Sequence, residues 1–199
     1  MRIYDISQEV FGCVVYPGDM PPQKIEDMRM EQGALYNLTS LQMCAHNGTH
    51  VDAPFHFIKD GKTVDELALE KMIGYAFVAE HEGLVTAEDA GHILEKAKKI
   101  NTKAGKRILL KGNAVVTLES AEILAKEGIY LIGVESQSVG PEDAPMAVHK
   151  VLLGAEVVLL EGIRLQNVPE GVYFLNAAPI SLAGADGAPC RAVLMELPE

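Results

Sequence analysis

The sequence predicts an α/β fold built on a mixed sheet. Four short, continuous apolar runs are typical of strands buried on both faces, and they lie at 107–110, 130–134, 157–160 and 173–177. Only a few helical segments separate the strands, which favours a mixed sheet. No internal repeat, low-complexity tract or linker interrupts the 199 residues, so we expect a single domain over residues 1–199.

Further strands are expected near both ends of the chain. Residues 2–6 alternate polar and apolar side chains, and they lead into a loop whose Tyr16-Pro-Gly-Asp19 sequence is a strong turn signal. The segments 24–30 and 35–44 repeat the alternation, which is typical of half-buried strands. The remaining strands are expected at 75–79 and 191–197.

Three segments carry helix signals, and they lie at 63–73, 86–100 and 118–126. In the first, Thr63 and Glu66 have the spacing of a capping box, and Gly74 ends the helix. Thr86 caps the second, whose acidic first turn and basic last turn match the helix dipole. Gly128 closes the third.

The composition excludes several classes of function. Lys and Arg number 17 against 28 Asp and Glu, giving a formal net charge of −11 and a pI of about 5.0. Such a surface repels phosphate backbones and anionic lipid, which argues against nucleic-acid and membrane partners. No apolar run approaches the roughly 18 residues of a membrane span, and the N-terminus lacks the apolar region of a signal peptide. Three widely spaced cysteines, Cys13, Cys44 and Cys190, favour a reducing cytoplasm over a disulfide framework.

Residues that carry chemistry concentrate in one short segment, His46-Asn-Gly-Thr-His50-Val-Asp52-Ala-Pro-Phe-His56. Imidazole nitrogen and carboxylate oxygen are the ligands that suit Zn²⁺, Mn²⁺ or Fe²⁺. Burying such groups without a partner would cost roughly 2–7 kcal/mol each, and a bound cation removes that cost. The spacing therefore predicts a metal site.

The backbone of this segment is expected to turn and then extend. Gly48 and Pro54 disfavour a helix through the segment, so the chain should turn at Gly48 and run extended from His50 to Asp52. Residues two apart in an extended strand share a face, so His50 and Asp52 would aim at one point. His46 would reach that point from before the turn. Three protein ligands would leave a coordination position open, which is the catalytic arrangement.

Two further candidates lie far downstream. Glu161 follows the apolar run 157–160, and a carboxylate at the end of a buried strand needs a partner or a shifted pKa. His149 precedes it in the chain by twelve residues. Neither residue alone would indicate a site. Both become candidates only in combination with the segment from His46 to His56.

Together these residues resemble the cyclase family of metal-dependent hydrolases, whose members include bacterial kynurenine formamidases and isatin hydrolases. The resemblance spans nearly the whole chain. It is carried by Tyr4-Asp-Ile-Ser7, Tyr16-Pro-Gly-Asp19, the HxGTHxDxPxH signature from His46 to His56, Gly133-Val-Glu-Ser-Gln-Ser138, His149 with Glu161, and Pro179 to Ala192. The histidine signature is long and specific, and the flanking matches follow it in order.

The resemblance implies a swivelling β/β/α domain with a mixed, barrel-like sheet, assembled as a homodimer or homotetramer. It also implies a divalent metal, either zinc at two ions per chain or manganese. One ion would be held by His46, His50 and Asp52. The second would be held by Asp52, His149 and Glu161, with Asp52 bridging the two ions.

The resemblance also assigns roles around the metals. His56, which Pro54 would bring to the rim of the site, would be the acid/base residue, and Tyr16 would line the substrate pocket. Two positions depart from the family pattern: Tyr16 replaces a residue that is commonly tryptophan, and Glu135 stands where related formamidases commonly have aspartate. Both departures bear on the substrate more than on the chemistry.

The implied activity is hydrolysis of a carbon–nitrogen amide bond in a small molecule. The expected reaction resembles that of the arylformamidases of tryptophan catabolism, which convert N-formylkynurenine to kynurenine and formate. Metal-activated water would attack the amide, and His56 would be the acid/base residue. Ring-opening hydrolysis of an isatin-like or other cyclic amide would use the same residues, so the sequence leaves both open. A non-catalytic metal-dependent binding protein is less favoured, because His56 and every candidate ligand are present. Cys44 lies two residues from His46, where a thiolate would compete for metal rather than attack a substrate.

Overall fold

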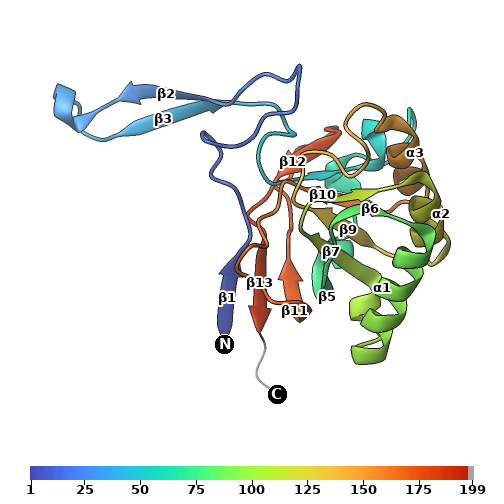
Figure 1. The fold of residues 1–199 in the computed structure, drawn as a ribbon. Helices are drawn as coiled ribbons and strands as arrows, with labels where there is room; N and C mark the ends of the chain where they lie inside the picture. The colour runs from blue at the N-terminus through green and yellow to red at the C-terminus, as the bar shows by residue number, and fades with distance from the viewer. Residues whose placement is uncertain (197–199) are drawn as a thin grey trace.

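The computed structural model describes residues 1–196 and is built on one large curled sheet (Figure 1). Within these residues the sheet has nine strands. Across the sheet they run β1 (Arg2–Asp5), β13 (Val193–Glu196), β11 (Gly171–Asn176), β5 (Ile73–Glu80), β7 (Arg107–Lys111), β9 (Leu131–Val134), β10 (Val158–Glu161), β4 (His50–Asp52) and β12 (Gly187–Pro189). The four apolar runs predicted as strands buried on both faces correspond to β7, β9, β10 and β11. The burial prediction is wrong for β11, in which only Tyr173 and Leu175 are buried.

The sheet is mixed, as predicted. Strands β5, β7, β9 and β10 pair in parallel, whereas β1, β13 and β11 on one side and β4 and β12 on the other pair antiparallel. Short strands β4 and β12 extend the sheet beyond β10. The predicted α/β class with a barrel-like mixed sheet is therefore confirmed.

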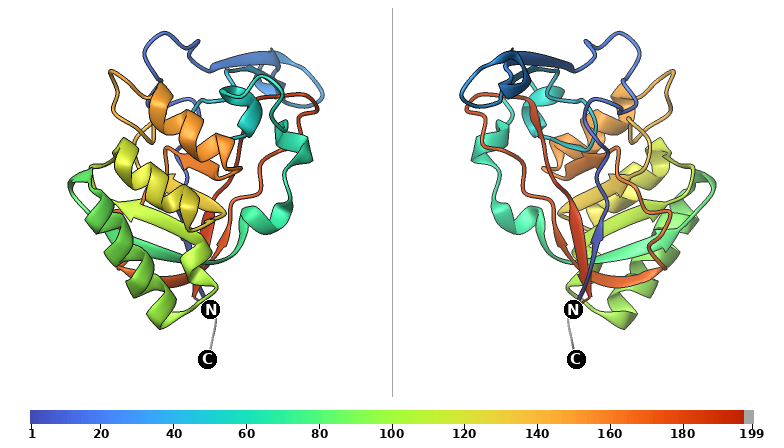
Figure 2. Two further views of the ribbon diagram at one scale, coloured as in Figure 1. Left: turned by 90° about the vertical axis from the view of Figure 1, so that its right-hand side faces the viewer. Right: turned by 90° about the vertical axis from the view of Figure 1, so that its left-hand side faces the viewer.

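The helices cover one face of the sheet (Figures 1 and 2). The described residues form three of them, α1 (Ala87–Ile100), α2 (Leu118–Lys126) and α3 (Met146–Gly154). The predicted helices at 86–100 and 118–126 are α1 and α2, and the Thr86–Asp89 pair forms a capping box at the start of α1. Helix α3 begins after Pro145 with no capping side chain, so the sequence carried no start signal for it.

Alternation along the strands divides the core into two layers. On β5, Phe77 and Ala79 point to the helices, while Ala76 and Val78 point to the concave side of the curled sheet. The concave layer also contains Val51 of β4, which is fully buried. Because residues i and i+2 share a face, the neighbours of Val51 on β4 point the opposite way. That opposite face, next to α3, is where the site lies.

The prediction of a helix at 63–73 is wrong. Two single 3-10 turns, η3 (Val64–Glu66) and η4 (Leu69–Lys71), occupy this stretch. The predicted capping box forms, with the Thr63 N–H donating to Glu66 Oε2 at 2.9 Å. The helix nevertheless ends at once, because Leu67 adopts an extended conformation that buries its side chain in the core. Burial of apolar residues has here overridden local helix signals.

The strands predicted at 24–30 and 35–44 exist, but the prediction that they are half-buried is wrong. They form a separate antiparallel hairpin, β2 (Gln23–Met28) and β3 (Leu38–Gln42), joined through the 3-10 turn η1 (Met30–Gln32). Every residue of both strands is exposed. The hairpin extends away from the rest of the molecule (Figure 1).

A few smaller elements complete the fold. A second short sheet pairs β6 (Gly83–Val85) with β8 (Ala114–Val116) in parallel. Two more 3-10 turns are η2 (Pro54–His56) and η5 (Ala104–Lys106). Strand β13 covers most of the strand predicted at 191–197, and position 197 lies outside the described residues. Between residues 1 and 196 no helix combines the length and apolar character needed to cross a membrane.

Candidate metal centre

Strand β4 carries the centre of the site. It lies between β10 and β12, and its register places His50 opposite Glu161 of β10. His50 and Asp52 are both 1% exposed and share the face of β4 opposite Val51. The extended conformation expected from the sequence is therefore present, and it brings a carboxylate from β10 beside the two residues of β4.

A turn at Gly48 brings His46 back to the same point. Gly48 has a φ of +71°, a left-handed conformation that favours glycine. Behind the turn, the Thr49 hydroxyl donates to the carbonyl of Gly162 at 2.8 Å and ties the turn to the end of β10. As a result His46 Nδ1 lies 2.8 Å from Asp52 Oδ1.

Helix α3 supplies the last imidazole. His149 Nδ1 donates to the Pro145 carbonyl at 2.8 Å, which directs Nε2 toward Glu161 Oε1, 3.4 Å away. Glu161 is itself held by the backbone N–H of Val139, which donates to Oε1 at 2.7 Å. Both His149 and Glu161 are 3% exposed. Two residues that the sequence could only associate by resemblance are thus neighbours in space.

The structure brings the predicted ligands together in two groups that share Asp52. His46, His50 and Asp52 form one group, and Asp52, His149 and Glu161 form the other. In each group one nitrogen or oxygen atom per residue lies within 4.8 Å of the others. These are the two sets that the resemblance implies.

The chemistry of the donors fits a divalent cation. The Nδ1 atoms of His50 and His149 donate to backbone carbonyls, so only Nε2 of each ring faces the carboxylates. His50 Nε2 lies 3.3 Å from Asp52 Oδ1 and 3.5 Å from Glu161 Oε2. These separations exceed the roughly 2.7–2.9 Å of a charge-assisted hydrogen bond. Ligand atoms about 2.1 Å from a shared tetrahedral cation lie about 3.4 Å apart. Within the two groups, the 3.3 Å from His50 Nε2 to Asp52 Oδ1 and the 3.4 Å from His149 Nε2 to Glu161 Oε1 match this spacing, whereas His46 Nδ1 and Asp52 Oδ1 lie at hydrogen-bond distance, 2.8 Å.

An unpaired oxygen supports the same conclusion. Among the described residues, buried Asp52 Oδ2 has no hydrogen-bond partner. A buried carboxylate oxygen without a partner is costly unless a cation binds it. Asp52 Oδ2 belongs to the residue common to both groups.

The ionisation of the cluster shows how strongly it attracts positive charge. Burial lowers the pKa of His50, but its contacts with Asp52 and Glu161 outweigh burial and raise it to about 9. Burial likewise lowers the pKa of His46, while hydrogen bonds with Asp186 and Asp52 raise it to about 11. For Asp52, burial raises the pKa and the two imidazoles lower it well below its usual range. The carboxylates therefore favour positive charge on the neighbouring imidazoles, and metal binding would compete with protonation there.

His56 lies at the rim, as expected from the sequence. Pro54 starts the 3-10 turn η2, which places the His56 side chain at 27% exposure, more open than the four buried ligand candidates. Its Nδ1 lies 3.1 Å from Asp186 Oδ2. Its ring packs edge-on against Phe57, with centroids 4.6 Å apart.

A cavity of about 220 Å³ opens beside the cluster. His56, Phe57 and His149 line one part of it, and Tyr16 lines another. The Tyr16 hydroxyl donates to the carbonyl of Glu142 at 3.2 Å, which holds the ring in place. The aromatic residue singled out by the resemblance therefore reaches the same cavity as His56.

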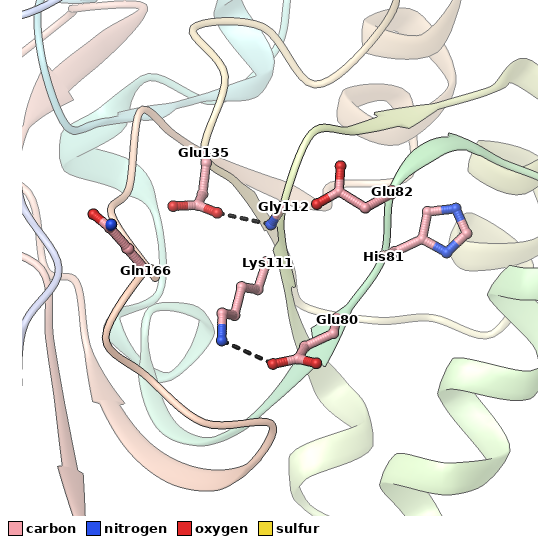
Figure 3. A pocket seen from close by; sticks show the side chains of 7 residues that line it. All are labelled: Glu80, His81, Glu82, Lys111, Gly112, Glu135 and Gln166. Carbon is pink, nitrogen blue, oxygen red and sulfur yellow. Dashed lines mark hydrogen bonds and ion pairs between the residues drawn. The ribbon is translucent and has the colours of Figure 1, made fainter.

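A larger cavity of about 540 Å³ lies elsewhere and shares no lining residue with the first (Figure 3). Its wall includes Glu135, the second departure from the family pattern. The Glu135 carboxylate accepts hydrogen bonds from the N–H groups of Gly112 at 2.7 Å and Leu165 at 2.8 Å. Glu135 therefore joins two loops, and its carboxylate belongs to this wall rather than to the metal centre.

Sequence reasoning missed several residues of the site, among them Phe57 of the cavity wall and Asp186, which contacts two of the histidines. Asp186 and Gly187 have the chemistry of a turn, yet the chain enters β12 there and pairs with β4. Asp186 Oδ2 lies 2.9 Å from His46 Nε2 as well as 3.1 Å from His56 Nδ1. Its place in the C-terminal segment that carries the family resemblance was the only signal available, because the contact spans 140 residues of chain.

Comparison with known proteins identifies the class and then the family. The fold and the donor groups define an α/β protein with a buried histidine–carboxylate metal centre. A solved structure described as a potential metal-dependent hydrolase with cyclase activity superimposes with a TM-score of 0.81 at 26% identity, covering 99% of each chain. An isatin hydrolase bound to thioisatinate has a TM-score of 0.82 over 99% of this chain and 92% of its own, but at 18% identity it shares only the fold.

Sequence relatives are closer. The chain is 34% identical to the kynurenine formamidase of Erythrobacter litoralis, covering 100% of this chain and 95% of that protein. It is 35% identical to the kynurenine formamidase of Salinibacter ruber, with 100% of both covered. The family model described as "Putative cyclase" matches residues 4–141. The chain belongs to the cyclase family.

Proposed function

We propose that this protein is a metal-dependent hydrolase that cleaves the carbon–nitrogen bond of an aryl formamide, in the manner of its kynurenine formamidase relatives. The observation that carries the proposal is the pair of donor groups that share Asp52 beside a cavity lined by His56. A structural or storage site would be closed by protein ligands, whereas this arrangement leaves room for water and substrate.

His46, His50 and Asp52 would hold one divalent cation, and Asp52, His149 and Glu161 a second. Nitrogen and carboxylate ligands suit zinc, and manganese is the alternative. When bound, such a cation would lower the pKa of a coordinated water toward about 7 and polarise the carbonyl to be attacked.

His56 moves the protons. His56 lines the cavity at the rim and belongs to neither of the groups that share Asp52; its own cluster is with His46 and Asp186. This position suits a residue that takes a proton from the attacking water and gives it to the leaving amine. An imidazole can both accept and donate a proton, as the two steps require. A positioned acid/base residue contributes a factor of about 10²–10⁴ to the rate.

Tyr16 would bind the aryl part of the substrate. It lines the same cavity as His56, and its hydroxyl hydrogen is donated to the Glu142 carbonyl. The aromatic ring would supply the apolar contact with the substrate. The cavity volume of about 220 Å³ suits a small aromatic molecule, below the roughly 300–1,000 Å³ of drug-sized sites.

The proposal includes assembly into a homodimer or homotetramer, with the β2–β3 hairpin as the contact. The apolar residues Ile25, Met28 and Leu38 of this hairpin are 44%, 40% and 44% exposed. A two-stranded hairpin is marginally stable alone in water, and exposed apolar patches mark interaction sites. A second copy of the chain would cover this surface.

We also place the protein in the cytoplasm, working as one domain over its whole length. Cys13, Cys44 and Cys190 are free thiols in the structure, which supports a reducing compartment. The antiparallel pairing of β1 with β13 joins both ends of the chain within one sheet and supports a single domain.

The test is metal analysis followed by a substrate panel. Protein purified without chelator should contain two equivalents of zinc or manganese per chain and should hydrolyse N-formylkynurenine or simpler N-formyl anilines. Isatin and cyclic imides belong in the same panel. Turnover of isatin with one metal equivalent would favour ring opening instead, and a metal-loaded protein that turns over none of these compounds would refute the proposal.

A further inference from the structure

Asp186 makes a contact that the roles assigned so far do not explain. One of its carboxylate oxygens, Oδ2, lies 2.9 Å from His46 Nε2 and 3.1 Å from His56 Nδ1. The two rings lie side by side, with centroids 4.2 Å apart and planes tilted by 32°. A single oxygen thus joins a proposed metal ligand to the proposed acid/base residue.

The contact determines which nitrogen of each ring carries a proton. A carboxylate can only accept, so His46 Nε2 and His56 Nδ1 are both donors. For His46 this leaves Nδ1, the atom 2.8 Å from Asp52, as the nitrogen that can bind a metal. For His56 it leaves Nε2 as the nitrogen that can exchange protons with substrate in the cavity.

The backbone around Asp186 is arranged for this contact. The Ala53 N–H donates to the Asp186 carbonyl at 2.9 Å, and the Val64 N–H donates to the Ala185 carbonyl at 2.9 Å. The next residue, Gly187, packs against the His46 ring: a Cβ there would lie 2.8 Å from its Cε1 atom, closer than packed atoms allow. The lack of a side chain at Gly187 therefore lets His46 approach Asp186.

We propose that Asp186 is a positioning residue that orients His46 for metal binding and His56 for proton transfer through one shared carboxylate oxygen. This inference rests on the proposed function for the proton-transfer half only. Asp186 is not among the residues that line the cavity, so it acts through the two histidines rather than by touching substrate. Carboxylates that accept the second N–H of a ligating histidine typically change metal affinity or activity by about 10- to 100-fold.

The test compares Asp186→Asn with wild type in metal affinity and in kinetics. The variant keeps the shape of the side chain and removes its charge. Zinc affinity, measured by competition with a chelating dye, should fall about 10- to 100-fold. At saturating zinc, kcat should fall by a similar factor, about 10- to 100-fold, while KM changes little.

A double-mutant comparison separates the two halves. In a His56→Ala background, Asp186→Asn should cause no further loss of kcat, because the residue through which it acts is gone, while the loss of zinc affinity should persist. An equal loss of kcat with and without His56 would overturn the proton-transfer half. Unchanged zinc affinity would overturn the metal-binding half.

Two further measurements keep the outcome independent of turnover and of folding. ¹⁵N spectra of histidine-labelled protein should show the Nδ1–H form of His56 in wild type and a mixture of forms in Asp186→Asn.

The matched control is Asp65→Asn, because Asp65 Oδ1 accepts the N–H of Gly184 and anchors the same loop without touching a histidine. If Asp65→Asn reproduced the losses, Asp186 would only hold the loop and the proposal would fail. If wild type turned over no amide, the proposed function would fail, while zinc affinity and the His56 spectrum would still test Asp186.

Discussion

At the scale of single residues, the site is defined by which atom of each side chain is already occupied. The Nδ1 atoms of His50 and His149 are bound to backbone carbonyls, so each ring has only Nε2 to offer. Asp52 has one oxygen near His46 and one without a hydrogen-bond partner in the described part of the chain. The roles of His56 and Asp52 follow from these differences and can be separated by mutation.

Replacing His56 with alanine should lower kcat and leave the metal in place. His56 lies at the rim and belongs to neither of the two donor groups that share Asp52. Loss of a positioned acid/base group should lower kcat by about 10²–10⁴-fold, measured on the formamide substrate alongside metal content by atomic absorption. If metal content fell with activity, His56 would be a ligand and its assignment as acid/base would be wrong.

Replacing Asp52 with alanine should instead remove the metal, and activity should be lost as a consequence. Asp52 belongs to both donor groups, so its loss should remove metal from both sites before any kinetic effect can be measured. Metal stoichiometry of the purified variant is the measurement. His56→Ala, purified in parallel, is the control, and circular dichroism should show that both variants are folded. Full metal occupancy in Asp52→Ala would exclude Asp52 as a ligand.

At the scale of elements, the β2–β3 hairpin carries three of its exposed apolar residues, Ile25, Met28 and Leu38, on one face, while Leu41 lies on the other. Register pairs Met28 with Leu38 and Ile25 with Ser40, and Leu38 and Ser40 share a face of β3 because they are two residues apart. The irregularity at Asp27 moves Met28 onto the same side as Ile25. The opposite face presents charged residues such as Lys24 and Glu26, which form an ion pair at 3.1 Å.

This asymmetry predicts the effect of charge on assembly. A glutamate at Leu38 places a charge in the apolar face and should convert the oligomer to monomer, as measured by light scattering after size-exclusion chromatography. Thr39 follows Leu38 in β3, so its side chain points to the opposite face of the hairpin. Thr39→Glu therefore adds the same charge away from the proposed interface and should leave the oligomer intact. Assembly that survived Leu38→Glu, or that was lost equally in both variants, would place the interface elsewhere.

At the scale of the whole molecule, the metal centre joins parts of the fold that are distant in sequence. Its donors come from a turn, from β4, from β10 and from α3, and β4 is also paired with β12. A cation bound at this junction would stabilise only the folded chain, since the donors are dispersed when the chain unfolds.

Removal of metal should therefore lower the melting temperature. At a free metal concentration 100 times Kd, binding stabilises the folded state by about 2.7 kcal/mol. In a chain of 150–250 residues, 1 kcal/mol shifts Tm by about 2–4 °C, so chelation should lower Tm by roughly 5–10 °C. Differential scanning calorimetry with and without chelator measures the shift, and Asp52→Ala should show none. Equal melting temperatures for metal-loaded and chelated wild type would contradict a metal bound at this junction.

Local sequence signals were reliable where the structure depends on neighbours in the chain. The cap of α1 at Thr86, the turn at Gly48 and the extended segment from His50 to Asp52 are all present as predicted. Burial was less predictable: alternation at 24–30 indicated a half-buried strand, but no other strand of the described chain covers it. The helix prediction after Thr63 was wrong for a related reason. Leu67 is extended and buried in the core, so the helix cannot continue through it.

The sequence by itself determined the kind of chemistry, because the donor types and their four-, two- and four-residue spacing from His46 to His56 are local properties of the chain. Only the tertiary structure decided which distant groups complete that chemistry. Pairing of β4 with β10 brings Glu161 opposite His50, and pairing with β12 brings Asp186 to the histidines. Strand pairing depends on the packing of the whole core rather than on local spacing, so no pattern within a short segment contains it.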